Sequence, residues 1–523
     1  MDRLLMWFQD RKKLIFLIIL TTILFRLPTL FIEVFNGDET HYATAAMVIL
    51  EGGLPYVDFV DKKPPLLYYI YAATFKIFWK DIRFVHFVAL LFVFATSYFI
   101  YRILMLYGHE RAGLLGALFY GLFSMAFIEQ DMWAANAEVF MALPMTLSAY
   151  FFLKGDCDNS LVSVGLSGFF LCIALLIKQQ AGILYPLYFI ALIYFSWNHG
   201  LKGVLKALFL QGSILVLASL IPIIAIVLYY YSVGHLKELV LWNVTYNFLY
   251  IDEGPEVMSV VLKGVFRTWA FIMSCLILWV LAFYYYMKRK AVPIFPGKLF
   301  FLVALWTLLT FPAIFTGGRL FGHYYFLLYP SIALLGGLGA EYFFNNIDRY
   351  IKWTKMLFVI FLFLTPLFFL VFGIYRSLSG GYQSAKPFIK KITHSVELET
   401  DPGDKIFSWG LFPYPYYYAN RLPASKFIAC EYLVPLWRNR FHKDKEYLPS
   451  QLKDRHKENM NILLKDLNDQ KPRVIIDVQG TKHLDNWNLY DLKHFPRLYQ
   501  FIQQNYELKD TVEGVDIYKL KKN

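Results

Sequence analysis

Residue types that could do chemistry are concentrated in one short segment, GDETHYATAAMVILEGGLPYVDFVDKKPPLLYY, at 37–69. Acids beside cations suit a reaction in which a phosphate leaves while a hydroxyl loses its proton. A carboxylate can accept that proton, and a cation can stabilise the phosphate. The segment follows the first long apolar run, so this chemistry would take place at a membrane boundary. Its ionisable residues are Asp38, Glu39, His41, Asp58, Asp61, Lys62 and Lys63.

Distant segments supply further candidates. Of three acids in EQDMWAANAE, Glu138 stands at the start of a predicted helix and is the best candidate, whereas Glu129 and Asp131 are expected to be solvated. Cations from three other regions would face these acids if all the segments end on the same side of the membrane. They are Arg83, Lys178 in LLIKQQAGIL, and Arg319 and His323 in TGGRLFGHYYFLLYP.

Each candidate also has an ordinary structural interpretation. Asp38 and Glu39 could cap a helix at 40–51, where carboxylates meet the positive end of the helix dipole. Lys63 and Arg83 could extend from the membrane edge toward water. A loop position would explain Lys178, and an aromatic belt would explain His323.

The elements that position these residues must be mostly membrane-spanning helices. Of 523 residues, 58% are hydrophobic and only 17% are charged. A soluble chain of this length could not cover so much apolar surface, so a large soluble protein is excluded. The net charge of +12 does not indicate nucleic acid, because Lys and Arg accumulate in cytoplasmic loops of membrane proteins.

About eleven spans are expected, with the N-terminus in the cytoplasm. The run 64–79 begins with two prolines and contains Lys76, so it is predicted to lie along the interface. This choice leaves sixteen Lys and Arg on the inside and nine on the outside, as the positive-inside rule requires. The expected spans are 14–32, 84–106, 112–128, 137–153, 161–177, 182–197, 207–231, 259–286, 299–316, 323–345 and 356–376.

The chain changes character after residue 376. Residues 377–523 are charged and alternate short strand-like runs, DKIFSWG, RVIIDV and VDIYKL, with a helical stretch at 454–469. This pattern predicts a small extracytoplasmic α/β domain. The expected organisation is therefore a transmembrane domain at 1–376, whose first outer loop at 33–83 carries the catalytic residues, followed by the α/β domain.

The order of four motifs resembles one known group of enzymes. GDE, then KPPL, then an aromatic–Arg start to the next span is similar to the GT-C superfamily of glycosyltransferases. The protein O-mannosyltransferases and lipid A aminoarabinose transferases are the nearest group. KKPPLLYY, AANAEVFMALP, GGRLFGHYYFLLYP and IFSWGLFPYPYYYANRLPASKF resemble its bacterial, dolichyl-phosphate-mannose-protein mannosyltransferase-like branch.

That resemblance implies an inverting transferase on the outer face of the bacterial inner membrane. Its donor would be a sugar linked to polyprenyl phosphate, and its acceptor a hydroxyl of a glycan, of lipid A or core sugar, or of a protein. His41 stands where the aminoarabinose enzymes have Arg. The predicted site comprises the catalytic acids Asp38, Glu39 and Glu138 and the phosphate-binding residues Lys63, Arg83, Lys178, Arg319, His323 and His41.

Several points stay open at this stage. The sequence identifies no particular cofactor, and a divalent metal, if one is used, could be held by Asp38, Glu39 or Asp61. The lipid bilayer is an expected partner, and nucleic acid is not. A transporter or flippase of lipid-linked sugars is the alternative function, although the expected charges lie at one face and no internal repeat is visible. A lipid-linked glycan polymerase or ligase is a third possibility.

Overall fold

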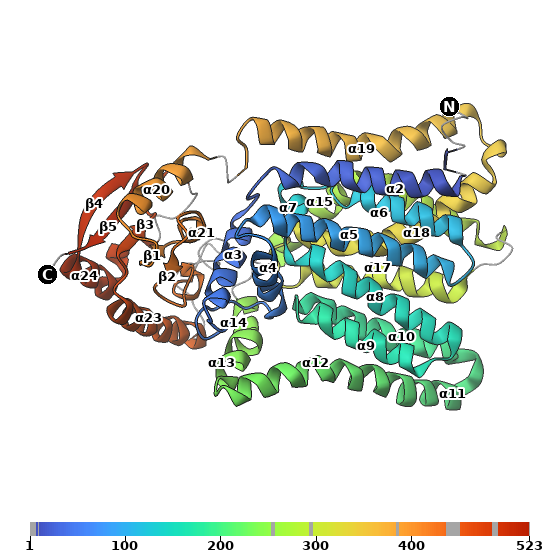
Figure 1. Cartoon of the computed structure of the whole chain (residues 1–523). Coiled ribbons are helices and arrows are strands. Elements are labelled where there is room, and N and C mark those ends of the chain that lie inside the picture. The colour runs from blue at the N-terminus through green and yellow to red at the C-terminus, as the bar shows by residue number, and fades with distance from the viewer. Residues whose placement is uncertain are drawn as a thin grey trace.

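The computed structural model describes residues 7–8, 10–252, 257–291, 296–382, 386–435, 450–483 and 490–521. Figure 1 shows a bundle of long helices lying side by side, with a small sheet-containing domain at one end. The first long helix begins at the opposite end of the bundle from this domain. The fold is therefore a polytopic helical bundle with a small C-terminal α/β domain, as the sequence predicts.

Long helices with apolar outer surfaces build the bundle. Phe209, Leu308 and Val371 are 80%, 64% and 64% exposed, which only a lipid environment would tolerate on so many helices. The helices are α2 (Arg11–Arg26), α5 (Ile82–Met105), α6 (Glu110–Phe123), α8 (Ala137–Asp158), α9 (Leu161–Leu175), α10 (Leu184–Ser196), α12 (Ser213–Ser232), α15 (Val257–Ser274), α16 (Leu276–Met287), α17 (Gly297–Phe315), α18 (Tyr329–Asn345) and α19 (Lys352–Leu378).

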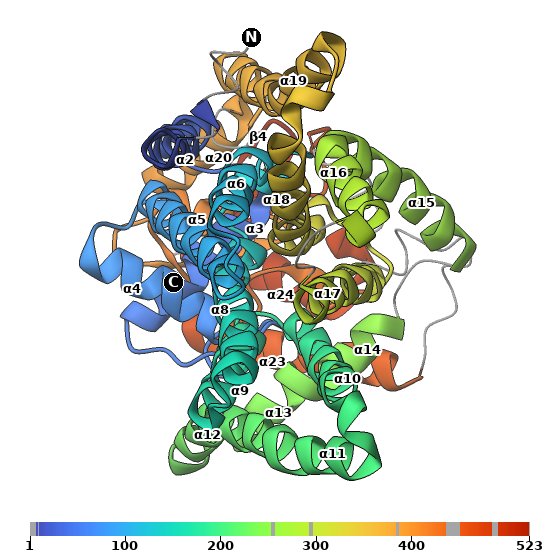
Figure 2. The same cartoon turned by 90° about the vertical axis from the view of Figure 1, so that its right-hand side faces the viewer.

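Seven helical segments in the described part of the chain are long and apolar enough to cross a membrane. One of them, Gln179–Ser232, makes two passes in Figures 1 and 2, because the chain turns at α11 (Gly200–Ala207). The span expected at 259–286 is divided at Cys275 into α15 and α16. A multi-pass protein is thus confirmed, while the number eleven stays a prediction.

Short helices cover the end of the bundle that meets the C-terminal domain. Both views show α4 lying across the bundle axis (Figures 1 and 2). It has 12 residues, too few to cross hydrocarbon, and it coincides with the run at 64–79 that the sequence assigns to the interface. The short helices at this end are α3 (Gly37–Leu50), α4 (Leu66–Ile77), α7 (Glu129–Trp133), α13 (Leu236–Val240) and α14 (Tyr246–Asp252).

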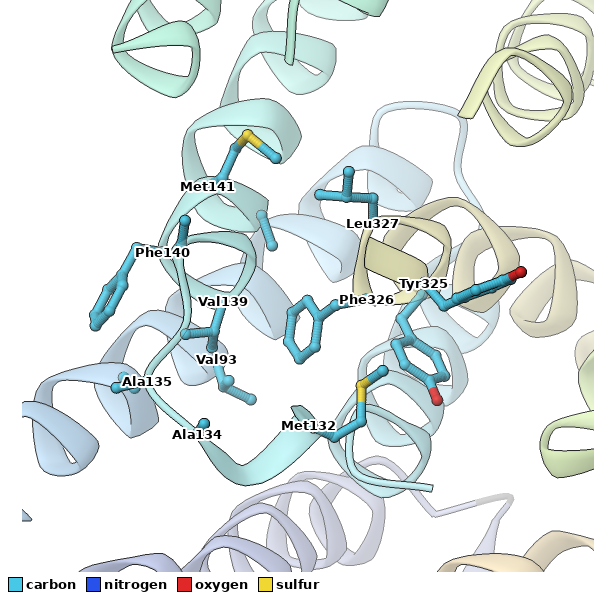
Figure 3. Packing of buried hydrophobic residues seen from close by; sticks show 14 of the residues in the cluster. Val93, Met132, Ala134, Ala135, Val139, Phe140, Met141, Tyr325, Phe326 and Leu327 are labelled. Carbon is cyan, nitrogen blue, oxygen red and sulfur yellow. The ribbon is translucent and has the colours of Figure 1, made fainter. Parts of the chain in front are cut away.

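Close packing fixes the ends of the spans beside these short helices. Figure 3 shows Val139 of α8 and Val93 of α5 pointing toward Phe326, which lies in the 3₁₀ helix η7 (Gly322–Leu328). Val93 is fully buried, and Val139 and Phe326 are each 2% exposed. The first turn of α8 and the helix η7 are therefore held against the same core, which brings their polar residues close together.

The C-terminal domain is a five-stranded sheet between two layers of helices. Its order is β2-β1-β3-β5-β4; β1 is parallel to β2 and β3, and β5 is antiparallel to β3 and β4. Ile406 belongs to the core that contains α20, whereas its neighbour Phe407 belongs to the core that contains α23 and α24. Both faces are buried, which explains the continuous apolar runs in the sequence.

The elements of this domain confirm the predicted strands and helix. α19 continues to Leu378, so the domain boundary expected after residue 376 falls in its last turn and stays a prediction. The elements are α20 (Pro387–Leu398), β1 (Lys405–Trp409), α21 (Tyr414–Tyr418), β2 (Leu422–Pro423), α23 (Ser450–Gln470), β3 (Val474–Asp477), α24 (Pro496–Asn505), β4 (Tyr506–Val512) and β5 (Val515–Leu520).

Candidate active site

A buried carboxylate organises the loop between α3 and α4. Asp61 is 1% exposed, and its Oδ2 lies 3.2 Å from Nε2 of His41 and 3.5 Å from Nζ of Lys63. The hydroxyl of Tyr432 donates a hydrogen bond to Oδ1 of Asp61 at 3.1 Å. These residues, with Lys62 and Glu431, are called the first-loop cluster below.

Two members of the first-loop cluster come from the C-terminal domain. Nζ of Lys62 donates to Oε2 of Glu431 at 3.0 Å, and both side chains are buried. Lys62 also lies 5.5 Å from the ring centre of Tyr432. Sequence reasoning missed Glu431 and Tyr432, because they lie some 370 residues after the loop that they contact.

The electrostatics of the first-loop cluster favour the charged forms of Asp61, Lys63 and Glu431, whereas burial lowers the pKa of Lys62. Burial raises the pKa of Asp61, but Lys63 and His41 outweigh it and hold that pKa well below its usual range. Burial lowers the pKa of Lys63, but Asp61 outweighs it and raises that pKa well above its usual value. In the same way, Lys62 lowers the pKa of Glu431 despite its burial. At neutral pH, Asp61, Glu431 and Lys63 are therefore charged.

Side chains from other parts of the chain donate hydrogen bonds to the backbone carbonyls of Lys62 and Lys63 and so hold the two lysines in place. The hydroxyl of Tyr56 donates to the carbonyl of Lys63 at 2.8 Å. The side-chain amides of Gln179 and Asn247 donate to the carbonyl of Lys62 at 2.7 and 2.8 Å. Because these donors come from three separate segments, the position of the lysines depends on the folded bundle and not on the loop alone.

Asp38 lies next to this cluster without being tied to it. It occupies the first turn of α3, where Asn36 is the N-cap and accepts the backbone N–H of Glu39. Asp38 is half-buried, and its carboxylate makes no hydrogen bond or ion pair within the described residues. Its charge raises the pKa of Lys63, which places the two side chains in one neighbourhood. The capping role is thus filled by Asn36, and Asp38 is available for another.

Glu39, in contrast, is fully buried and fully engaged. Its carboxylate accepts the backbone N–H groups of Phe35 and Ala135, each at 2.7 Å. Its Oε1 also lies 2.7 Å from Nε2 of His86, whose Nδ1 faces the carbonyl of Thr29 at 2.7 Å. Glu39 therefore connects α3 to α5 and to the loop before α8, which suits a positioning residue better than a catalytic one.

A second acid–cation group lies at the first turn of α8. Lys178 and Glu138 form a buried ion pair, and Nζ of Lys178 lies 4.2 Å from the ring centre of Tyr324. Nδ1 of His323 lies 3.7 Å from Oδ1 of Asp131. These residues are called the α8 cluster below. Leu66 donates its N–H to the carbonyl of Leu176 at 3.0 Å, so the two clusters are joined near Lys178.

Tyr42 lies between the two clusters. The charges of Asp38, Lys63, Asp61 and Glu138 all act on its hydroxyl. Its ring lies 5.1 Å from Nζ of Lys63. The structure therefore brings together most of the residues that the sequence singled out, at the end of the bundle facing the C-terminal domain.

Two arginines that the sequence assigns to phosphate binding, Arg83 and Arg319, are not members of either cluster. The guanidinium of Arg83 is half-exposed and pairs with Asp81, so Arg83 lies in neither cluster. Arg319 is 1% exposed, and its charge acts on Lys62, which places it beside the first-loop cluster.

The expectation that the acids of EQDMWAANAE are solvated is wrong for Glu129. It is 4% exposed and forms an ion pair with Arg376 at the end of α19. Asp131 is partly buried because His323 lies against it. Each side chain contacts a basic residue from a segment that follows it by about 190 or more residues. A contact between segments so far apart cannot be inferred from the local sequence.

The acids do not gather in a way that suits a metal. No group of three or more His, Cys, Asp or Glu residues in the described ranges lies close enough together to hold an ion. Glu39 is engaged by His86 and two N–H groups, and Asp61 is neutralised by Lys63 and His41. The candidate ligands Asp38, Glu39 and Asp61 therefore give no basis for a metal-dependent step.

Comparisons with known proteins agree with this architecture. Residues 62–226, less than half of the chain, match the family described as dolichyl-phosphate-mannose-protein mannosyltransferase. The structure of ArnT from Cupriavidus metallidurans bound to undecaprenyl phosphate is 11% identical, covers 96% of this chain and 97% of its own, and has a TM-score of 0.60. A search of the curated proteins found no match.

An archaeal oligosaccharyltransferase is also similar. AglB from Archaeoglobus fulgidus, in complex with an inhibitory peptide and a dolichol-phosphate, is 10% identical with a TM-score of 0.54. The match covers 97% of this chain and 74% of that one. These similarities confirm the resemblance to the GT-C superfamily at the level of the fold.

Proposed function

We propose that this chain is an inverting glycosyltransferase that moves a sugar from a polyprenyl-phosphate donor to an acceptor hydroxyl. The observation that carries the proposal is the position of Asp38. It is a half-buried carboxylate without a partner among the described residues, beside a buried group of cations. A carboxylate that can accept a proton and cations that can bind a phosphate are the two groups that such a transfer needs, and their proximity supports the proposal.

The residues divide into two roles. Asp38 takes the proton of the acceptor hydroxyl as its oxygen attacks the anomeric carbon. The bond between that carbon and the phosphate oxygen breaks, its electron pair leaves with the phosphate, and the configuration inverts. Lys63 contacts the phosphate, and Lys178 and Arg319 contribute charge from other segments, because a cation stabilises the full negative charge that the phosphate regains. His41 can donate a hydrogen bond from its ring.

The donor class is supported by the relatives and by the charges. The similar structures of ArnT and AglB hold undecaprenyl phosphate and dolichol-phosphate, respectively. In this chain Nζ of Lys63 lies at the long distance of 3.5 Å from Asp61, so its other N–H groups can reach a phosphate without breaking a strong bond.

The positive-inside count supports an orientation with the N-terminus in the cytoplasm and the C-terminal domain outside the bacterial inner membrane. The reaction would then take place at the outer face, because both clusters lie at the end of the bundle that bears this domain (Figure 1). A reporter fused after Asn523 should be active outside the cytoplasm, and a cytoplasmic signal would reverse the proposed orientation.

The decisive experiment separates catalysis from binding. Asp38→Asn keeps the size of the side chain but cannot accept a proton, so transfer from a polyprenyl-phosphate sugar should fall by about 10²–10⁴-fold. Binding of sugar-free polyprenyl phosphate should stay unchanged, since Asp38 is not one of the cations. Near-normal transfer by Asp38→Asn would exclude Asp38 as the base and make Glu138 the next candidate.

A further inference from the structure

An apolar groove of about 320 Å³ lies among α16, α18 and the beginning of α19. Helix α16 packs against both α18 and α19, and Figure 2 shows the three helices together. The beginning of α19 is at the end of the bundle opposite the C-terminal domain (Figure 1). None of the residues of the first-loop or α8 cluster lines this groove, which we call the α16–α19 groove.

The α16–α19 groove has a buried floor and open rims. The lining residues Leu281 and Phe358 are 3% and 4% exposed, whereas Val280 and Leu357 are 50% and 48% exposed. The groove therefore opens sideways, toward the lipid that surrounds the bundle. Side chains that line an unfilled groove lose dispersion contacts on one side, so an apolar molecule that fills it is favoured.

The length of the groove matches one half of a bilayer. Its lining residues run from Leu276 to Tyr284 along α16, and from Thr354 to Phe361 along α19. At 1.5 Å per residue these stretches are about 12 Å and about 10 Å long, while half of the hydrocarbon core is about 15 Å thick. The groove ends where α16 begins, after the break at Cys275. It therefore has the length for an acyl chain from one leaflet.

The polar lining residues lie at one end of the groove. They are Tyr284, Tyr350 and Thr354, and the hydroxyls of the two tyrosines form a hydrogen bond with each other. All three are partly exposed. Tyrosine is enriched where membrane spans meet the lipid head groups. This end is therefore the mouth of the groove, at the level of the head groups.

Basic residues surround this mouth. Lys288 lies one turn of α16 after Tyr284, to whose carbonyl its N–H donates at 3.1 Å. Arg349 precedes Tyr350, and its charge acts on the hydroxyl of that tyrosine. The segments 288–290 and 348–355 contain six basic residues and one acid, namely Lys288, Arg289, Lys290, Arg349, Lys352, Lys355 and Asp348.

Positive charge alone does not distinguish this place from others at the same end of the bundle. Lys202 and Lys206 of α11 are also exposed there, as the positive-inside rule leads one to expect, but they lie outside the groove. At the α16–α19 groove the cations stand at the mouth of an apolar slot as long as an acyl chain. An anionic head group complements these cations, whereas a choline head group adds a positive charge of its own.

We propose that the α16–α19 groove binds one acyl chain of an anionic phospholipid, whose phosphate lies against Lys288, Arg349 and Lys352. The bound lipid links α16 to α19, the helix that leads into the C-terminal domain. This site lies at the end of the bundle away from the two clusters, and it does not depend on the proposed transfer reaction.

Titration of the delipidated, full-length protein, followed by native mass spectrometry, tests the proposal. The probes are dioleoyl phosphatidylglycerol, dioleoyl phosphatidylcholine and glycerol phosphate, which has the anionic group without acyl chains. We expect a saturable binding event for phosphatidylglycerol, weaker binding of phosphatidylcholine and none of glycerol phosphate. Equal binding of phosphatidylcholine would show that the head group is not recognised, and equal binding of glycerol phosphate a site for soluble phosphates; either result overturns the proposal.

Groove-filling variants test the place of the acyl chain. Val280→Trp and Leu357→Trp occupy the groove without changing its charge, and each should weaken phosphatidylglycerol binding about tenfold. Val265→Trp is the matched control, because Val265 of α15 is 66% exposed and does not line the groove. An equal loss of binding in Val265→Trp, or no loss in the two groove variants, would contradict the proposal.

Charge variants test the place of the phosphate. Arg349→Gln and Lys352→Gln should each weaken phosphatidylglycerol binding about fivefold, whereas Lys202→Gln and Lys206→Gln at the same end of the bundle should leave it unchanged. Equal effects at both pairs of positions would indicate a general response to positive charge and overturn the proposal. Lys63→Ala should also bind phosphatidylglycerol normally. Loss of binding in Lys63→Ala, with normal binding in the groove variants, would place the lipid at the first-loop cluster instead.

Discussion

The first-loop cluster and the seam cavity, a polar cavity of about 510 Å³ lined by residues of α5, α19, α20 and α21, are built in opposite ways. The cluster is closed: Asp61 and Glu431 are buried, and each is held by a lysine and by further contacts. The cavity is open, and two hydroxyls on its wall, those of Thr393 and Tyr418, have no partner in the described chain. The difference is between a closed cluster of paired charges and an open cavity whose wall carries both acids and bases.

Such a division has a physical reason. A leaving phosphate develops charge at one place in every reaction cycle, so prearranged charges lower its energy without reorganising. The seam cavity has acids and bases on its wall and offers no comparable concentration of prearranged positive charge. The comparison is tested by asking whether changes in the two regions have different consequences.

The largest difference between changes in the first-loop cluster and changes in the seam cavity should be in the free energy of unfolding. Glu431→Ala removes the partner of the buried Lys62, and breaking a buried pair in this way costs about 3–5 kcal/mol. Glu397→Ala removes a half-exposed carboxylate from the seam cavity and should change stability far less. Thermal unfolding of both variants in the same detergent measures the contrast.

Glu431→Gln controls for lost packing, because it keeps the shape of the side chain and removes only its charge. It should be destabilised in the same direction as Glu431→Ala. Equal and small effects for the changes at Glu431 and Glu397 would contradict the view that the cluster is the more rigid region.

A large effect on binding is expected for Lys63. Lys63→Ala should weaken the affinity for sugar-free polyprenyl phosphate about 10- to 100-fold, since a hydrogen bond to a charged group contributes about 1.5–3 kcal/mol. Arg83→Ala is the comparison, because Arg83 is half-exposed, pairs with Asp81 and lines the cavity. If Arg83→Ala weakens phosphate binding more than Lys63→Ala, the assignment of the two regions is reversed.

Sequence patterns predicted the features of the fold that depend on residues close together in the chain. Apolar length gave the multi-pass bundle, alternating short runs gave the strands β1, β3 and β5, and an early Pro pair separated the short helix α4 from the spans. The crowding of acids and cations at 37–63 located the first-loop cluster. In each case the signal lies within some 25 residues of chain, which is the scale on which periodicity and charge can be observed.

Long-range partners could not be predicted in this way. Glu431 and Tyr432 reach the first loop only because the C-terminal domain lies against the end of the bundle. Glu129, expected to be solvated, is buried by Arg376, which lies 247 residues later. Asp38 and Glu39 are adjacent in the same motif, yet the fold makes one available and engages the other fully. Which of two neighbouring acids is free depends on segments that only tertiary structure brings together.

The next expected effect is smaller and concerns how the stability of the first-loop cluster depends on pH. Lys63 and His41 hold the pKa of Asp61 well below its unfolded value despite burial, so its contribution is present above about pH 4 and is lost as pH falls toward the folded pKa. Asp61→Asn should therefore be less stable than wild type from about pH 5 to 9, with the difference shrinking below about pH 4.

Thermal unfolding of wild type and Asp61→Asn at several pH values measures this difference. Glu397→Gln, in the seam cavity, serves as the control and should show little pH-dependent difference. A gap between wild type and Asp61→Asn that stays constant down to about pH 3 would mean that Asp61 does not gain stability from its cations.

The smallest expected effect concerns Tyr432. Tyr432→Phe removes the hydroxyl that donates to Oδ1 of Asp61 at 3.1 Å but keeps the ring that lies against Lys62. Losing one hydrogen bond of this kind costs about 0.5–1.5 kcal/mol, so the affinity for polyprenyl phosphate should fall about two- to tenfold through a less well held Asp61–Lys63 pair. Arg83→Ala, which changes the wall of the seam cavity, is the comparison and should leave this affinity nearly unchanged. Unchanged phosphate affinity in Tyr432→Phe would show that this hydroxyl does not help to position the Asp61–Lys63 pair.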